Sequence, residues 1–327
     1  MKLKRTTITS LLFKIFVPSI LALVALGVAV DMMVVRRLTH LKHVKPATGP
    51  QDYLEISNVQ LPWSDEQWMN SDSTISHGWL LRRGANSPAI ILSHGYGDGA
   101  NRSDLLDLGV DLWRAGYTVL MYDLRGHGES AVEWTSLGDY ESDDLVSAIK
   151  YLKTVKDSSG APLIDPSRIG LYGVSLGGYA SLVAAAEDSG VRAVAVDSVY
   201  PTPDSYAHVL TREEFGVSSK VINDVVDLGL WATFQSRYTK SSAIDAVRNY
   251  QDVQLMLIGG ANAADLRQTT GLVYIQSLEP HQITEVGMSR IYRLRSSDSA
   301  IYNQMIIDFF KRTNTAPTTT QAQKPKK

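Results

Sequence analysis

The order of apolar and polar residues divides the chain into an apolar N-terminal stretch and a longer part of alternating short runs. The apolar stretch extends from Leu11 to Val35 and contains two charged residues, Lys14 and Asp31. About 20 mostly apolar residues are enough to cross the hydrocarbon core of a bilayer. The stretch therefore predicts one transmembrane helix over about residues 12–35. A signal peptide cleaved near Ala25–Gly27 is the alternative, but the apolar run continues past that point, which favours an uncleaved anchor.

The basic residues around the predicted span do not set its orientation. Four lie on each side of it, namely Lys2, Lys4, Arg5 and Lys14 before and Arg36, Arg37, Lys42 and Lys45 after. The positive-inside count is therefore tied. A short basic N-terminal tail is usually retained inside, and this favours a single-pass membrane protein with its domain on the extracytoplasmic side.

Beyond residue 51, short apolar runs alternate with amphipathic ones. Alternation or continuous apolar character predicts strands, whereas a period of 3.6 predicts helices. Strands that alternate with helices predict an α/β domain with a doubly wound, mostly parallel sheet of about eight strands. The predicted strands are residues 53–61, 76–83, 89–93, 117–122, 168–172, 192–197, 255–258 and 290–294, and the clearest helices are 105–114, 140–153 and 302–312.

Composition excludes several classes of function. The 327 residues include 32 Lys and Arg against 34 Asp and Glu, so the formal net charge of −2 argues against a broad nucleic-acid-binding face. The absence of cysteine excludes disulfides, a thiol nucleophile and cysteine-ligated zinc. The histidines are scattered without ligand spacing, so the sequence predicts no metal site and no cofactor.

One pentapeptide, Gly173-Val174-Ser175-Leu176-Gly177, carries the strongest chemical signal. It stands between an apolar run and a helix-forming run, which is the strand–turn–helix setting of a G-x-S-x-G nucleophile elbow. Glycines two residues before and after the serine allow close backbone approach in a strained turn. The pattern predicts that the Ser175 hydroxyl is exposed at the mouth of the sheet as a nucleophile. A glycine-rich turn with an idle serine is the alternative.

Three motifs in order resemble the α/β-hydrolase fold family over about Tyr53 to Arg312. They are the loop Ser93–Gly99, with the sequence Ser-His-Gly-Tyr-Gly-Asp-Gly, the loop Tyr122–Ser130, and the pentapeptide around Ser175. The resemblance implies an oxyanion hole formed by the backbone N–H groups of Tyr96 and Leu176. It also implies that His94 and His127 structure these loops and do not take part in catalysis.

The resemblance also sets domain boundaries. It implies a hydrolase domain over residues 52–312, with a cap over 200–242, after an anchor (1–37) and a linker (38–51). The Thr-, Ala-, Gln- and Lys-rich segment 313–327 is predicted to be disordered. Aromatic residues in the cap suit an apolar substrate, but ordinary packing of cap helices is the favoured explanation.

The other two members of a serine-hydrolase triad are missing from their expected places. The family places the acid near Ala263, and Asp265 two residues later is a candidate acid or a helix cap. The loop after the predicted last strand contains no histidine. His281 is a candidate base if residues 272–277 form the last parallel strand, and His208 in the cap is a further candidate.

Two functions from different classes follow. In the first, the protein is a membrane-anchored serine hydrolase that acts on an ester, amide or peptide through an acyl-enzyme on Ser175. In the second, it is a degenerate hydrolase-fold protein that binds a small-molecule or peptide ligand, or a partner, without hydrolysis. Losing the base of a serine triad costs on the order of 10⁶ in turnover, so the position of a histidine decides between them.

Overall fold

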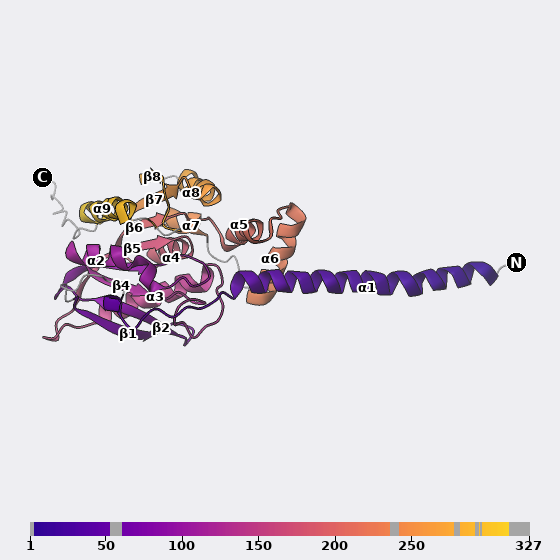
Figure 1. Ribbon diagram of the computed structural model, residues 1–327, viewed down its shortest axis with the longest axis horizontal. Helices are drawn as coiled ribbons and strands as arrows, with labels where there is room; N and C mark the ends of the chain where they lie inside the picture. Colours follow the sequence, from indigo (N-terminus) through magenta and orange to yellow (C-terminus); the bar gives the residue numbers. More distant parts are fainter. Residues whose placement is uncertain are drawn as a thin grey trace, which may run out of the picture.

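The computed structural model describes residues 3–52, 61–235, 242–277, 282–291, 294 and 296–313. A globular α/β domain carries a long helix, α1 (Leu3–Thr39), which projects away from it (Figure 1). The predicted strand at 53–61 is nearly all outside the described residues, and so is the predicted tail beyond Thr313.

The domain is built on an eight-stranded sheet in the order β1-β2-β4-β3-β5-β6-β7-β8. The pairs β1–β2 and β2–β4 are antiparallel, and all later pairs are parallel, which confirms the predicted mostly parallel α/β sheet. The strands are β1 (Trp63–Met69), β2 (Ile75–Leu81), β3 (Ser87–Ser93), β4 (Thr118–Tyr122), β5 (Ile164–Val174), β6 (Val191–Asp197), β7 (Gln254–Gly260) and β8 (Gln282–Val286).

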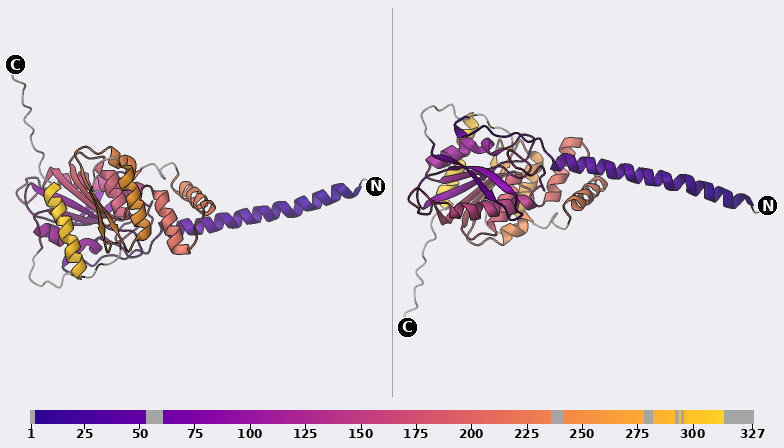
Figure 2. Two further views of the ribbon diagram at one scale, coloured as in Figure 1. Left: turned by 90° about the horizontal axis from the view of Figure 1, so that it is seen from above. Right: turned by 90° about the horizontal axis from the view of Figure 1, so that it is seen from below.

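Helices cover both faces of the sheet (Figure 2). One apolar core lies between the sheet and helices α3 and α4. A second core lies on the other face, between the sheet and helices α2 and α9. Burial on both faces explains why the central strands are continuous apolar runs in the sequence. The helices are α2 (Leu106–Arg114), α3 (Asp139–Thr154), α4 (Leu176–Ala185), α5 (Pro203–Phe215), α6 (Lys220–Phe234), α7 (Ala243–Arg248), α8 (Ala264–Gln276) and α9 (Ser296–Thr313), with 3₁₀ turns at Pro50–Asp52 and Arg102–Leu105.

The last strand is the main correction to the sequence analysis. It is β8, not residues 290–294, and the alternative strand at 272–277 belongs mainly to helix α8. Ile275 is exposed and Val273 is buried, so that run turns around a helix that has one buried side. β8 pairs only with β7 among the described strands, and its Ile283 is partly exposed, which left a weak apolar signal in the sequence. β1, at the other edge, was missed for the same reason.

Helix α1 has two environments. Lys14–Thr39 is long and apolar enough to cross a membrane, and its large apolar side chains from Ile15 to Met33 are mostly exposed. A membrane span and a secretion signal both satisfy this criterion. The last turns of α1 are different, because Val35 and Leu38 are buried in the core of the domain. The carboxyl-terminal end of α1 is therefore part of the globular fold.

Helices α5 and α6, called the cap here, lie within residues 200–242, the segment predicted as a cap, and beside α1 in both figures. The approach of α1 to α6 is close at Gly229, where an added Cβ would lie 2.3 Å from an Asp31 carboxylate oxygen. Asp31, the acidic residue inside the apolar stretch, therefore faces helix α6.

Candidate active site

Ser175 occupies a sharp turn between strand β5 and helix α4. Its backbone angles are φ 49° and ψ −109°, a region that costs a non-glycine residue about 1–3 kcal/mol. The flanking glycines are required by packing, since an added Cβ on Gly173 would lie 2.2 Å from the carbonyl oxygen of Gly177. On Gly177 it would lie 2.4 Å from the carbonyl oxygen of His94. The G-x-S-x-G spacing therefore reflects contact of the turn with its own helix and with the loop after β3.

Two buried histidines organise the loops beside this turn. His94 Nε2 accepts from the Leu124 N–H at 3.0 Å, so its Nδ1–H donates to the Gly95 carbonyl at 2.7 Å. His127 Nδ1 is 2.9 Å from the Arg125 carbonyl. Burial lowers the pKa of His94 to about 4 and that of His127 to about 3, so both are neutral at pH 7. Both histidines position backbone groups, as expected from the sequence.

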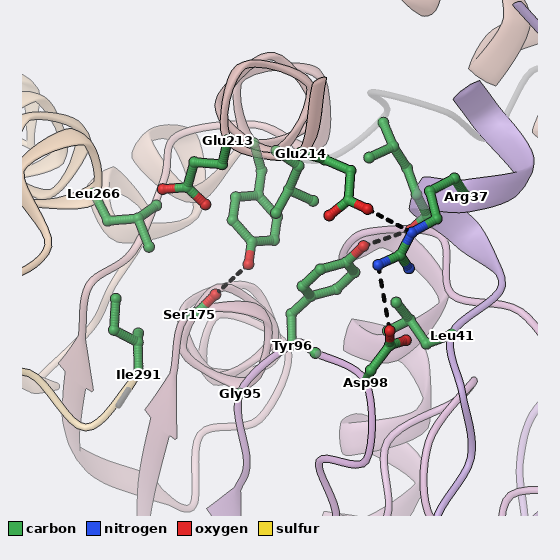
Figure 3. A pocket seen from close by; sticks show the side chains of 14 residues that line it. Arg37, Leu41, Gly95, Tyr96, Asp98, Ser175, Glu213, Glu214, Leu266 and Ile291 are labelled. Carbon is green, nitrogen blue, oxygen red and sulfur yellow. Dashed lines mark hydrogen bonds and ion pairs between the residues drawn. The ribbon is translucent and has the colours of Figure 1, made fainter. Parts of the chain in front are cut away.

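A cavity of about 240 Å³ opens at Ser175 (Figure 3). Its walls come from six parts of the chain: the end of α1 with the residues just after it, the loop after β3, the turn at Ser175, helix α5, helix α8 and the loop after β8. Tyr96 and Gly95 lie beside Ser175, which brings the candidate oxyanion loop to the candidate nucleophile. Leu176 begins helix α4 directly after Ser175. The lining residues are Arg37, Leu38, Leu41, Gly95, Tyr96, Gly97, Asp98, Ser175, Tyr206, Leu210, Glu213, Glu214, Leu266 and Ile291.

The Ser175 hydroxyl is hydrogen-bonded to a tyrosine of the cap. Ser175 Oγ donates to Tyr206 Oη at 2.8 Å, and both side chains are buried (Figure 3). The Tyr206 ring stacks on Tyr200 with centroids 4.1 Å apart, and Tyr200 stacks on Tyr179 in turn. Tyr206 on α5 is thus held by ring packing in the place where a triad would have its base.

Asp265, the candidate acid, does not face Ser175. Its carboxylate forms an ion pair with the Arg212 guanidinium of α5 and is partly exposed. Ala263, at the position where the resemblance implies the acid, is buried. Leu266, which follows Asp265 on helix α8, lines the cavity (Figure 3). The first turn of α8 therefore gives an apolar group to the site, and Asp265 links α8 to the cap.

The two candidate bases are not brought to Ser175 by the described structure. His281 lies outside the described residues; β8, which follows it, begins at Gln282 beside Met256 and reaches the carboxyl edge of the sheet at Val286. His208 Nε2 is 2.8 Å from the Asp227 carboxylate, a contact between α5 and α6. In the described part of the chain, no histidine is hydrogen-bonded to Ser175.

The loop after β8, where the family has its histidine, contains Ser289, Arg290 and Ile291. The Arg290 guanidinium forms a bidentate ion pair with Asp107 of α2, at 2.6 and 3.0 Å. Ile291 is the described residue of this loop that lines the cavity, where it lies near Ser175 (Figure 3). The described part of the loop thus presents an apolar side chain to the cavity and no imidazole.

A buried carboxylate, Asp197 at the end of β6, holds this loop in place. Its oxygens accept from the Ser289 hydroxyl at 2.7 Å, the Arg290 N–H at 2.8 Å and the Tyr302 hydroxyl at 2.6 Å. Burial raises the pKa of the Asp197 carboxyl, and these donors oppose the shift. With its acceptors occupied by the loop, α9 and Ser198, Asp197 has a positioning role.

Several residues of the site were missed by sequence reasoning. Tyr206 belongs to a segment identified as a cap, but its position on α5 gave no sign that it faces Ser175. Arg37 stood in the basic run after the predicted span, yet its guanidinium bonds Glu214 at 2.7 Å and Asp98 at 3.3 Å at the rim of the cavity (Figure 3). Glu213 also lines the cavity. The pKa of its carboxyl is raised, mainly by burial and secondarily by the nearby Asp265 carboxylate.

The comparison with protein families agrees with this architecture. The sequence model described as X-Pro dipeptidyl-peptidase (S15 family) matches residues 79–282. The chain belongs to this family. The matched S15 region extends from strand β2 to the start of β8, and it includes the loop of Tyr96, the turn at Ser175 and the cap.

Individual relatives of this S15 family chain cover part of it. It is 28% identical over 176 residues to the thiohydrolase aneE of Aspergillus aculeatus, which is 50% of this chain and 52% of that protein. It is 33% identical over 143 residues to the polyketide transferase ATR5 of Stachybotrys chlorohalonatus, 43% and 45% of the two chains. The chain thus spans about half the length of the curated relatives it matches.

Solved structures show the same fold. The esterase PF2001 of Pyrococcus furiosus superposes with a TM-score of 0.64 and 19% identity, over 85% of this chain and 99% of the esterase. At 19% identity this similarity establishes the α/β-hydrolase fold. The chemistry of the site has to be inferred from the residues of this chain.

Proposed function

We propose that this protein binds the carbonyl group of an ester, thioester, amide or peptide in the Ser175 cavity without histidine-assisted hydrolysis. The observation that carries the proposal is the hydrogen bond of Ser175 Oγ to Tyr206 Oη at 2.8 Å. A tyrosine hydroxyl is a much poorer acceptor for the proton of a serine hydroxyl than the imidazole of a triad. Ala263, at the position where the resemblance implies the acid, and Ile291, which the loop after β8 brings to the cavity, support the same conclusion.

The remaining parts of the site suit carbonyl binding. Backbone N–H groups of Tyr96 and Leu176 beside the amino end of α4 are the donors that the fold uses for a carbonyl oxygen. The cavity of about 240 Å³ is slightly smaller than the usual 300–1,000 Å³ of small-molecule sites, so it fits a short acyl group. Leu38, Leu210 and Leu266 supply apolar walls.

A serine hydrolase that forms an acyl-enzyme on Ser175 is the second candidate. The strained backbone of Ser175 supports it, because strain of this kind is retained at functional sites. The names of relatives, a thiohydrolase and an esterase, point the same way. This candidate needs a base, either His281, which lies outside the described residues, or Tyr206, which is already hydrogen-bonded to Ser175. Asp265 would have to leave its ion pair with Arg212 to serve as the acid.

Ligand binding and turnover by the full-length protein in lipid nanodiscs separate the two candidates. For the proposed function, p-nitrophenyl acyl esters bind, are not turned over above background, and still bind to Ser175→Ala. Leu210→Trp fills the cavity and abolishes binding. Esterase turnover or fluorophosphonate labelling that is lost in Ser175→Ala would establish the hydrolase and reject the binding protein.

We also propose that α1 anchors the protein as an uncleaved single-pass span, with the domain outside the cytoplasm. Because the chain has no cysteine, Ser159→Cys at an exposed turn gives one reactive thiol. An impermeant maleimide labels it on intact cells if the domain faces out, and only after lysis if it faces in. An N-terminal tag that remains on the mature protein shows that the anchor is not cleaved.

A further inference from the structure

The cap helix α6 has an apolar stripe that faces solvent. Val221, Val225 and Leu228 are 72%, 42% and 61% exposed, and their spacing of four and three residues places them on one side of the helix. The opposite side, with Val226, Leu230 and Phe234, is buried in the core. Helix α6 is therefore apolar on both sides, which is unusual for a helix at a water-facing surface.

The position of α6 relative to α1 indicates what covers this stripe. Helix α6 lies on the side of the domain from which α1 projects, and its Gly229 meets α1 at Asp31 (Figures 1 and 2). A span of about 20 residues that begins at Leu11 ends at Val30, immediately before Asp31. The boundary of the hydrocarbon then lies at the level of α6. If the span begins after Lys14 instead, the hydrocarbon boundary lies further along α1, and α6 lies deeper in the bilayer.

From this juxtaposition we infer that the stripe of α6 lies in the membrane interface, in contact with lipid of the bilayer that α1 crosses. The inference rests on the proposed anchor. The apolar surface is then continuous from the exposed side chains of α1 to the stripe, and burying the stripe in lipid removes its apolar area from water. Trp231, 57% exposed next to the stripe, is a residue type that prefers this depth.

The location also bears on the ligand. Arg37, at the rim of the cavity, is six positions after Asp31, which corresponds to about 9 Å along the helix axis. The cavity is therefore within reach of an amphiphile held in the same leaflet, whose carbonyl group lies near the interface. The Ser175 site would then take its ligand from the membrane surface.

Site-directed labelling tests the contact, since the native chain has no cysteine. The full-length protein carries bimane at Val225→Cys or Leu228→Cys and is reconstituted in phosphatidylcholine vesicles with doxyl-labelled lipid. Ile275→Cys, at a 70% exposed apolar position on α8, is the matched control, and Val24→Cys reports the span. We expect blue-shifted emission and loss of intensity by doxyl quenching at Val225 and Leu228, as at Val24, and none at Ile275.

Two outcomes overturn the inference and are distinguishable. If the Val24 label is quenched but the stripe labels behave like Ile275, α1 spans the bilayer and α6 does not touch it. If the Val24 label is not quenched either, the anchor itself fails, and the inference fails with it. Thermal unfolding monitored by circular dichroism verifies that each labelled variant is folded.

Discussion

At the scale of single residues, the site combines a strained serine with the absence, among the described residues, of a histidine bonded to it. Ser175 has a strained backbone conformation, and Tyr96 lies beside it. The Ser175 hydroxyl is bonded to Tyr206, and Ile291 lies in the same cavity. Removing a triad member costs nearly as much as removing the triad, so a serine in this setting is expected to be almost inert.

Tyr206→Phe tests whether the tyrosine acts on Ser175. The variant keeps the ring stack and loses one hydrogen bond, so the free energy of unfolding in urea should fall by about 1 kcal/mol. Tyr250→Phe, which loses a comparable bond from its hydroxyl to the Leu182 carbonyl, is the control. We expect background fluorophosphonate labelling in both variants. Labelling of the native protein that disappears in Tyr206→Phe alone would make Tyr206 the base.

The buried histidines predict an effect of pH on stability. His127 has a pKa of about 3 in the folded protein, against about 6.5 when unfolded, so the unfolded state binds more protons below pH 6.5. The contribution of neutral His127 to the free energy of unfolding is complete above pH 6.5 and is lost as the pH falls toward 3. At pH 5 the loss amounts to about 2 kcal/mol.

Urea unfolding at pH 7 and pH 5 measures this loss. The native protein should lose more stability over this interval than His127→Gln, and the difference isolates His127 from other titrating groups. Equal losses in the two proteins would show that His127 is not buried in neutral form.

At the scale of elements, the end of α1 belongs to the domain as much as to the predicted span. Leu38 is buried, and Arg37 connects α1 to Glu214 of α5 and to Asp98 of the loop after β3. These ion pairs are well exposed and contribute little stability. The apolar contacts are what fix α1 to the cap and make it a wall of the cavity.

Leu38→Ala should therefore destabilise the globular domain by about 2–5 kcal/mol, the usual cost of removing a buried leucine side chain. Leu23→Ala, in the exposed part of α1, is the control and should leave the unfolding of the domain unchanged. Thermal or urea unfolding in detergent is the measurement. Equal, small effects of both substitutions would show that α1 is not packed on the domain.

At the scale of the molecule, the α/β-hydrolase fold is retained, while the described loops bring no histidine to Ser175. The eight strands, the turn at Ser175 and the cap enclose the cavity in the arrangement of hydrolases. The departures from the catalytic pattern that the resemblance implies lie in the loops after β7 and β8, at Ala263 and Ile291. Loops at the carboxyl edge of such a sheet carry the chemistry, so they can change while the core is kept.

Restoring the missing groups tests this view. The double variant Ala263→Asp and Ile291→His supplies an acid and a base in the two loops, and we expect it to hydrolyse p-nitrophenyl acetate faster than the native protein. The gain should disappear when Ser175→Ala is added. Native turnover that already matches the double variant would show that the native site has a base, and would reject the proposed function.

The sequence by itself determined the fold and the place of the candidate site. Close-packed glycines around Ser175 and buried parallel strands leave strong local patterns, because backbone contact and burial on two faces restrict residue type at fixed spacing. Edge strands β1 and β8 leave weak patterns, since one side of each is open. Only the tertiary structure decided that Tyr206 and Ile291 face Ser175 and that Arg37 and Leu38 form its wall. Side chains from distant segments meet there through helix packing, which local sequence does not encode.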